Sequence, residues 1–342
     1  MAATTQSSPK PQNTLTAWWQ KTSTRRLAYT YLLPAFIVMG IITFYPLFYQ
    51  IWMSFTDYGI KNLRMDSAPP NVVGLQNYKD IFTGGLAAKV PNFNFYKLLF
   101  FNLFWTFSNV ILHVTIGVLI AVLLNIRGLW FKGIYRTLYV LPMVLPSLVI
   151  AVVWRNMFDQ DAGAINHVLA WFGSFFGMSE EMFRIRWLEQ IAAPVPWLPF
   201  LPLSYFAVLI TNVWLGWPFM TIVATGALQS IPHDLYEAAS IDGANASQKF
   251  WGITVPLIRP AMVPAAMYGI ILTFNQFNVI YFVSGGGPLR QTEIMVTTAF
   301  RLVNEQRLYG MAAAFSVLIF FVLLALTLAT NRVTKATESY NV

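Results

Sequence analysis

The sequence contains no cysteine and few charged residues. The absence of cysteine from its 342 residues excludes disulfide bonds, cysteine-ligated zinc and iron–sulfur clusters, but says nothing about the cellular compartment. Only 11% of the residues are charged and 56% are hydrophobic, which is far from the balance of a soluble domain. The net charge of +8 is scattered over loops without a basic stripe interleaved with aromatic residues, so no nucleic-acid partner is expected.

Several motifs of catalysis and energy coupling are also missing. There is no G-x-x-x-x-G-K-[ST] phosphate loop, so a separate chain would have to bind any ATP, and no cofactor is expected. No acid/base pair or partnered nucleophile indicates an enzyme. His167 and His233 lack ligand-like spacing, so no metal site is expected. The apolar segments contain no Asp or Glu, which weighs against proton-coupled transport but leaves sodium coupling through carbonyls open.

Long apolar segments dominate what is present. Windows of about 20 apolar residues require a bilayer, and in lipid they must be helices because unsatisfied backbone groups are too costly there. The sequence lacks the alternating strands of about ten residues that a membrane barrel would need. We therefore predict an all-α polytopic membrane protein with six transmembrane helices, at about 30–55, 100–126, 137–157, 204–228, 260–283 and 308–330.

The placement of basic residues predicts the orientation. Arg25 and Arg26 precede the first apolar segment, which is too long for a cleavable signal, so the N-terminus is expected to lie in the cytoplasm. The same orientation places the short basic loop around Lys132 inside, and an even number of spans places the C-terminus inside as well. The predicted organisation is a cytoplasmic segment, a transmembrane domain with a long cytoplasmic loop, and a cytoplasmic tail: 1–29, 30–330 with 229–259, and 331–342.

The loop at 229–259 carries the most specific pattern, E-A-A-x3-G-x9-I-x-x-P, which starts at Glu237. Gly243 is expected to break a helix, and the second helical piece is expected to stop before Pro256. A helix–break–helix on the soluble face of a membrane protein suits docking into a groove on a partner. An ordinary amphipathic connector is the alternative interpretation.

The fourth span contains a second candidate site within residues 211–219. Pro218 favours a kink that exposes carbonyls, and the missing side chain of Gly216 would leave room for a sugar ring. Trp214 and Trp217 offer stacking surface beside amide groups, which suits a sugar because ring faces stack on aromatics and amides bond hydroxyls. Helix packing, with the tryptophans in an interface belt, is an equally open interpretation.

Polar and proline residues in other spans extend this hypothesis. The fifth span holds Thr273, Asn275, Gln276 and Asn278, and this number of polar groups predicts that at least one face lines a polar cavity. Met143 lies between two prolines in the third span, where it would face either a cavity or the core. For His113 in the second span, we expect a hydrogen bond between helices and not a proton relay.

Together, these motifs resemble the maltose-type, larger-subunit permeases of carbohydrate ABC importers. The resemblance covers about residues 27–335. It rests on the Glu237 loop and on six further groups of residues: Leu33-Pro34 through Tyr45-Pro46; Ser54-Phe55-Thr56-Asp57; Leu141-Pro142 with Pro146-Ser147; Asn212 to Gly216 with Pro218-Phe219-Met220; Phe277 to Tyr281 with Gly286-Gly287-Pro288; and Tyr309 to Ala314.

The resemblance implies a type I ABC importer permease in a bacterial inner membrane that carries a di- or oligosaccharide. Its implied partners are a second permease subunit, two ATPase subunits and an external solute-binding protein, with membrane lipid around the spans. It implies a coupling role for the following residues: Glu237, Ala238, Ala239, Asp242 and Gly243. It implies a mid-membrane sugar site at Asn212, Trp214, Leu215, Gly216, Phe219, Leu272, Thr273, Gln276 and Met143.

The match at the sugar site is incomplete. The maltose pattern has Phe and Asn side chains in the fifth span where this sequence has Leu272, Thr273 and Gln276, and an aromatic residue where it has Met143. These differences argue against maltose itself but not against a di- or oligosaccharide. A secondary transporter and a non-transport membrane scaffold remain the alternative functions.

Overall fold

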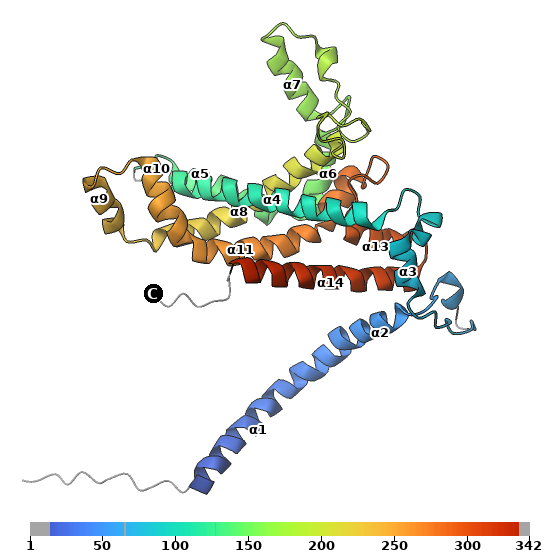
Figure 1. Ribbon diagram of the computed structural model, residues 1–342. Coiled ribbons are helices and arrows are strands. Elements are labelled where there is room, and N and C mark those ends of the chain that lie inside the picture. Colours follow the sequence, from blue (N-terminus) through green and yellow to red (C-terminus); the bar gives the residue numbers. More distant parts are fainter. Residues whose placement is uncertain (1–13, 65, 127, 335–342) are drawn as a thin grey trace, which may run out of the picture. The chain divides into compact units, whose positions relative to one another are not determined.

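The computed structural model describes residues 14–64, 66–126 and 128–334 (Figure 1). Most of the predicted tail 331–342 and the first part of the predicted segment 1–29 therefore lie outside the described residues. The chain divides into two compact units between Met53 and Ser54.

The first unit is a continuous helical segment that matches the first predicted span. It consists of α1 (Thr14–Met39), the π-helical turn η1 (Gly40–Phe44) and α2 (Tyr45–Met53). Its portion Arg26–Met53 is 28 residues long and contains an 18-residue window with a mean hydropathy of 1.9, enough to cross a bilayer.

The second unit is helical almost throughout. Among the described residues, extended pairing is limited to one isolated bridge between Thr56 and Val72, so the all-α prediction is confirmed. The longer helices are α3 (Gln76–Thr83), α4 (Phe95–Leu124), α5 (Lys132–Val144), α6 (Ser147–Met157), α7 (Ala164–Ser174), α8 (Leu203–Gln229), α9 (His233–Ile241), α11 (Val255–Phe274), α13 (Met295–Asn304) and α14 (Tyr309–Thr334). Between them lie η2 (Ile60–Asn62), η3 (Gly85–Ala88), η4 (Glu180–Phe183), α10 (Ala246–Lys249), η5 (Phe250–Thr254), α12 (Phe277–Val279) and η6 (Ile280–Ser284).

Helices α4, α8 and α11 form the centre of this unit, and each packs against the other two. Gly117 of α4 allows a close approach to α8, because a Cβ at this position would lie 2.5 Å from Cβ of Met220 and 3.0 Å from the backbone nitrogen of Thr221. Small residues commonly permit such contacts between membrane helices. The three helices therefore provide a fixed frame for the polar residues between them.

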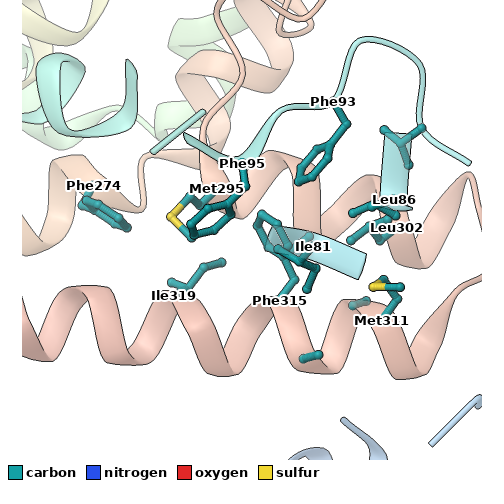
Figure 2. Close-up of a cluster of buried hydrophobic side chains, with 14 residues drawn as sticks. Ile81, Leu86, Phe93, Phe95, Phe274, Met295, Leu302, Met311, Phe315 and Ile319 are labelled. Carbon is teal, nitrogen blue, oxygen red and sulfur yellow. The ribbon is translucent and has the colours of Figure 1, made fainter. Parts of the chain in front are cut away.

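A second buried cluster joins the first loop of this unit to α13 and α14. Figure 2 shows Ile81 and Leu86 close to Phe315 of α14 and Leu302 of α13. All four side chains are at most 1% exposed. The segment 56–99 is thus anchored to the helical unit by its apolar residues.

The number of spans depends on the helix pair α5 and α6, which is bent by 98° at its break. Residues at the end of α4, such as Asn125, and residues that follow α8, such as His233, line one cavity of about 340 Å³. The last turns of α4 and α8 therefore lie at the same end of the unit, and α8 begins at the opposite end. The chain between Lys132 and Leu203 has to cross from one end to the other, so the bent pair counts as one span and the predicted total of six holds.

Two boundaries of the predicted fifth span were wrong. The helix begins at Ala246, earlier than the predicted 260, and it ends at Phe274 instead of 283. The prediction that the second helical piece stops before Pro256 was also wrong, because η5 runs directly into α11. The N–H of Val255 bonds the carbonyl of Phe250 in a π-type turn, and this places Pro256 in the first turn of α11, where its missing N–H is tolerated.

Candidate functional site

The segment from His233 to Thr254, called the Glu237 segment below, forms two helices that meet at a glycine break, as predicted. Helix α9 ends at Ile241, and Gly243 follows with φ of +80°, which favours glycine. Asn245 begins the next helix with a capping box: its side chain accepts from the N–H of Gln248 at 2.9 Å, and the Gln248 side chain accepts from the N–H of Asn245 at 2.8 Å. The break is therefore built into the local sequence.

Side-chain bonds hold the two helices of this segment together. The hydroxyls of Tyr236 and Thr254 lie 2.9 Å apart, and Lys249 Nζ donates to Ser240 Oγ at 2.7 Å. These bonds link α9 to α10 and η5 across the break. The angle between the helices is thus set by the segment itself.

The outer surface of the segment exposes both acidic and apolar side chains. Glu237 and Asp242 are exposed, as are Ala238 and Gly243, whereas Ala239 is half-buried. Ile241 is 87% exposed and Trp251 is 66% exposed. A rigid projection with exposed carboxylates and large apolar side chains is suited to docking, although the coupling role of these residues stays a prediction.

The second predicted site lies where α8 meets α4. Asn212 is only 2% exposed and bonds both neighbouring helices. Its Nδ2 donates to Asn109 Oδ1 at 2.8 Å, and its Oδ1 accepts from Gln276 Nε2 at 3.1 Å. Its backbone carbonyl lies 3.0 Å from Nε2 of His113, which confirms the expected bond between helices. A carbonyl can only accept, so this nitrogen of His113 carries a proton.

The space that Gly216 leaves is taken by a side chain of the same protein. A Cβ at position 216 would lie 2.3 Å from Cε1 and 2.4 Å from Nε2 of His113. The predicted room for a sugar ring is therefore filled by the imidazole. The glycine allows α8 to approach α4 at this point, and its assignment to a sugar site stays a prediction.

The fifth span is interrupted next to this cluster. Helix α11 ends at Phe274 and α12 begins at Phe277, with Gln276 between them. The freed carbonyls are capped by α4: Trp105 Nε1 donates to the carbonyl of Thr273 at 3.1 Å, and Asn102 Nδ2 donates to that of Phe274 at 3.2 Å. Because unpaired backbone groups are costly in a membrane, these caps make the break possible.

The predicted sugar residues differ in their exposure. Asn212 and Thr273 are buried, while Leu272 is 52% exposed and Met143 is 44% exposed. Four others are half-buried: Trp214, Leu215, Phe219 and Gln276. Their aromatic rings already have partners, since Trp214 packs edge-on against Trp154 and Phe219 lies against Tyr268. The structure thus brings Asn212 and Gln276 together, while the other span-four residues contact other helices and Met143 lies in the bent third span.

Sequence reasoning missed the polar residues of α4. Asn102, Trp105 and Asn109 are all completely buried and bond α8, α11 or their own helix. A signal was available, because these residues and His113 repeat every three or four positions and so share one helical face. Their partners lie about 100 or more positions away in the sequence, so local patterns do not reveal them.

The Gly285–Pro288 turn surrounds a buried carboxylate. Gly286 has φ of +75°, and a Cβ there would lie 2.5 Å from Cγ of Glu293, which is 3% exposed. Arg301 and Arg290 approach this carboxylate at 2.7 and 3.4 Å. Burial raises the pKa of Glu293, and the two arginines act in the opposite direction. The turn thus encloses a buried, ion-paired carboxylate.

Comparison with known proteins places the chain in a family. Residues 113–338, more than half of the chain, match the family described as binding-protein-dependent transport system inner membrane component. The chain is a member of this family. It is 31% identical to the trehalose/maltose transport system permease protein MalF of Thermococcus litoralis, over 90% of the chain and 93% of the relative. It is 30% identical to the galactooligosaccharides transport system permease protein GanP of Bacillus subtilis, over 96% of the chain and 74% of the relative.

The fold agrees with this membership. One solved chain, from a bacterial ABC transporter involved in the import of the acidic polysaccharide alginate, superposes with a TM-score of 0.72. The superposition covers 94% of this chain and all of the other, at 19% sequence identity. The predicted type I ABC importer permease fold is therefore confirmed.

Proposed function

We propose that this chain is a permease subunit of an ATP-driven importer for a di- or oligosaccharide. Two relatives are named for the transport of trehalose, maltose and galactooligosaccharides, which supports this substrate class. The chain itself would do no chemistry, and a separate subunit would bind and hydrolyse ATP. Transport would proceed by alternating access around a site near the middle of the membrane.

The observation that carries the coupling role is the rigid, exposed segment from His233 to Thr254. Its helices are fixed to each other by internal bonds, while Glu237 and Asp242 point to solvent. A segment of this kind transmits force because it moves as one body. We assign it to the contact with an ATPase subunit, two of which would serve this chain and a second permease subunit.

The proposed orientation follows from the same assignment. Docking to an ATPase requires the Glu237 segment to lie in the cytoplasm, and Lys132 and its described neighbours lie at the same end of the unit. With six spans, both termini would be cytoplasmic. The opposite end, with the segment 158–202, would face a solute-binding protein outside a bacterial inner membrane.

The sugar site is proposed for the region where α8 meets the break after α11. Gln276 offers an amide, and Trp214, Leu215 and Phe219 offer partly exposed apolar surface on α8, the helix that Gln276 contacts through Asn212. Sugars are held by this combination of amides for hydroxyls and ring faces for CH groups. The exposed Leu272 and Met143 complete the proposed set.

Reconstitution of the complex tests the function directly. The chain would be placed in liposomes with its second permease and ATPase, and sugar-loaded binding protein would be added outside. We expect uptake of a di- or oligosaccharide from a panel of maltose, trehalose and a galactooligosaccharide, together with sugar-stimulated ATP hydrolysis. Uptake driven by a sodium gradient without ATP would instead support a secondary transporter, and no uptake with any member would support a scaffold.

A further inference from the structure

One face of α4 carries a stripe of buried polar side chains that the proposed function does not use. Asn102, Trp105, Asn109 and His113 follow one another at intervals of three or four residues, and none is more than 4% exposed. Buried polar groups within membrane spans are costly unless they have partners, and such groups usually mark functional regions. Each of the four side chains forms a hydrogen bond, either to a group that shapes the proposed sugar site or to the helix backbone beside it.

The side-chain amides in this stripe have only one possible orientation. Asn109 lies 2.8 Å from the backbone carbonyl of Trp105, and only its Nδ2 can donate to that carbonyl. Oδ1 of Asn109 must therefore face Asn212, 2.8 Å away, which has to present its own Nδ2. That leaves Oδ1 of Asn212 for Gln276, which donates from Nε2 at 3.1 Å. Each amide thus fixes the orientation of the next.

The hydrogen bonds from Asn109 through Asn212 to Gln276 form a relay of side-chain amides. Its last atom is Oε1 of Gln276. Among the contacts of the described residues this atom has no hydrogen-bond partner, whereas both amide atoms of Asn212 are occupied. Gln276 is half-buried, while Asn212 is 2% exposed. Consequently, Gln276 presents an acceptor to a ligand, whereas Asn212 is buried and bonds its two neighbours.

We propose that Asn109 is a positioning residue of the sugar site: it fixes the amide of Asn212 and thereby leaves Gln276 Oε1 as an acceptor for one sugar hydroxyl. This inference rests on the proposed function. It predicts that a hydroxyl of the ligand donates to Gln276 Oε1, and it gives Asn212 a supporting role in place of direct contact. His113 assists by holding the Asn212 backbone, while Asn102 and Trp105 hold the break that places Gln276.

The test replaces one hydroxyl of the sugar at a time. The probes are monodeoxy-fluoro derivatives of the panel sugar that the reconstituted wild-type complex transports, because fluorine accepts but does not donate. Uptake is measured with saturated binding protein, so that the permease determines selectivity. For wild type, we expect one fluorinated position to reduce uptake on the order of fivefold, the value of one typical hydrogen bond. Gln276→Ala should remove that difference.

Asn109→Leu should behave like Gln276→Ala, because Asn212 and Gln276 are then free to turn. The double variant that combines Asn109→Leu with Gln276→Ala should be no less selective than either single variant. Asn109→Asp should restore selectivity, since a neutral acid donates to the Trp105 carbonyl and accepts from Asn212 as asparagine does. Thr106→Val is the matched control: its hydroxyl is buried on the same helix and bonds only the Asn102 carbonyl. It should keep wild-type selectivity.

Three results would overturn the relay while leaving the proposed function intact. They are wild-type selectivity in Asn109→Leu, an equal loss of uptake for every fluorinated sugar in that variant, and failure of Asn109→Asp to restore selectivity where Asn109→Leu has lost it. Failure of the wild-type complex to take up any sugar of the panel would instead contradict the proposed function itself. Assembly with the ATPase, measured by co-purification, distinguishes loss of selectivity from loss of folding.

Discussion

At the scale of single residues, Gly216 illustrates how a contact across two helices changes the meaning of a sequence motif. Read along the chain, a glycine beside Pro218 leaves space for a ligand. In the structure, His113 from α4 fills that space and donates a hydrogen bond to Asn212. The same glycine that seemed to make room for a substrate is needed for helix packing.

Gly216→Ala should therefore destabilise the protein. The added methyl group would force His113 away from the Asn212 carbonyl, and such overpacking costs about 1–3 kcal/mol. The thermal unfolding midpoint of the purified protein in detergent should fall. Gly226→Ala on the same helix is the control, because a Cβ there meets no atom within 4 Å, and it should leave the midpoint unchanged or raise it. An unchanged midpoint for Gly216→Ala would contradict the packing role.

Trp105 permits a second prediction at this scale. Trp105→Phe keeps an aromatic ring but removes the Nε1 donor to the Thr273 carbonyl. The Thr273 carbonyl then keeps its bond from the N–H of Gln276, so losing the Trp105 bond should cost about 0.5–1.5 kcal/mol and loosen the break before Gln276, and both thermal stability and sugar uptake should fall. Trp154→Phe, which changes a half-buried tryptophan that packs against Trp214, serves as a comparison. If both variants are equally stable, the break does not depend on this cap.

At the scale of elements, the sequence predicts most helices but only one of their two main interruptions. Apolar length alone locates the spans, and Gly243 with the Asn245 capping box locates the break in the Glu237 segment. The break at 275–276 has neither glycine nor proline, and its stability comes from Asn102 and Trp105 of α4. Local patterns cannot indicate such a site, because the residues that satisfy it lie about 170 positions away.

The Glu237 segment allows a prediction about an element that is rigid and exposed. Glu237→Lys should leave the fold intact, since the side chain is exposed, but should weaken the contact with the ATPase through charge reversal. We expect uptake to fall by roughly tenfold or more if the carboxylate has a cationic partner. Glu237→Gln, which removes the charge without reversing it, should reduce uptake less. Wild-type uptake and ATPase co-purification in Glu237→Lys would remove the coupling assignment.

Gly243 lies at the break that sets the angle between the two helices of the Glu237 segment. Gly243→Pro should abolish coupling, because φ of +80° is closed to proline and the break would have to change direction. Gly243→Asn should be tolerated, since asparagine accepts left-handed backbone and nothing lies within 4 Å of a Cβ at this position. Sugar-stimulated ATP hydrolysis measures both effects. Equal activity of the two variants would show that the angle is unimportant.

At the scale of the whole molecule, the topology rests on the bent pair α5–α6. Composition predicted a third span over 137–157, and the structure gives two helices bent by 98°. A re-entrant pair would return to the same face of the membrane, whereas a single bent span would cross it. The cavity shared by the ends of α4 and α8 requires the crossing, because it fixes both ends on one side.

Because the chain has no cysteine, single cysteines can report this topology without a background signal. Trp130→Cys, Ser179→Cys and Ser247→Cys each alter an exposed residue, before α5, after α7 and in the Glu237 segment. With a membrane-impermeant maleimide, positions 130 and 247 should be labelled in inside-out vesicles and position 179 in right-side-out vesicles. Labelling of 130 and 179 from the same side would make α5–α6 a re-entrant loop. Since α8 still separates 179 from 247, it would also place the Glu237 segment and the loop before α5 on opposite sides of the membrane.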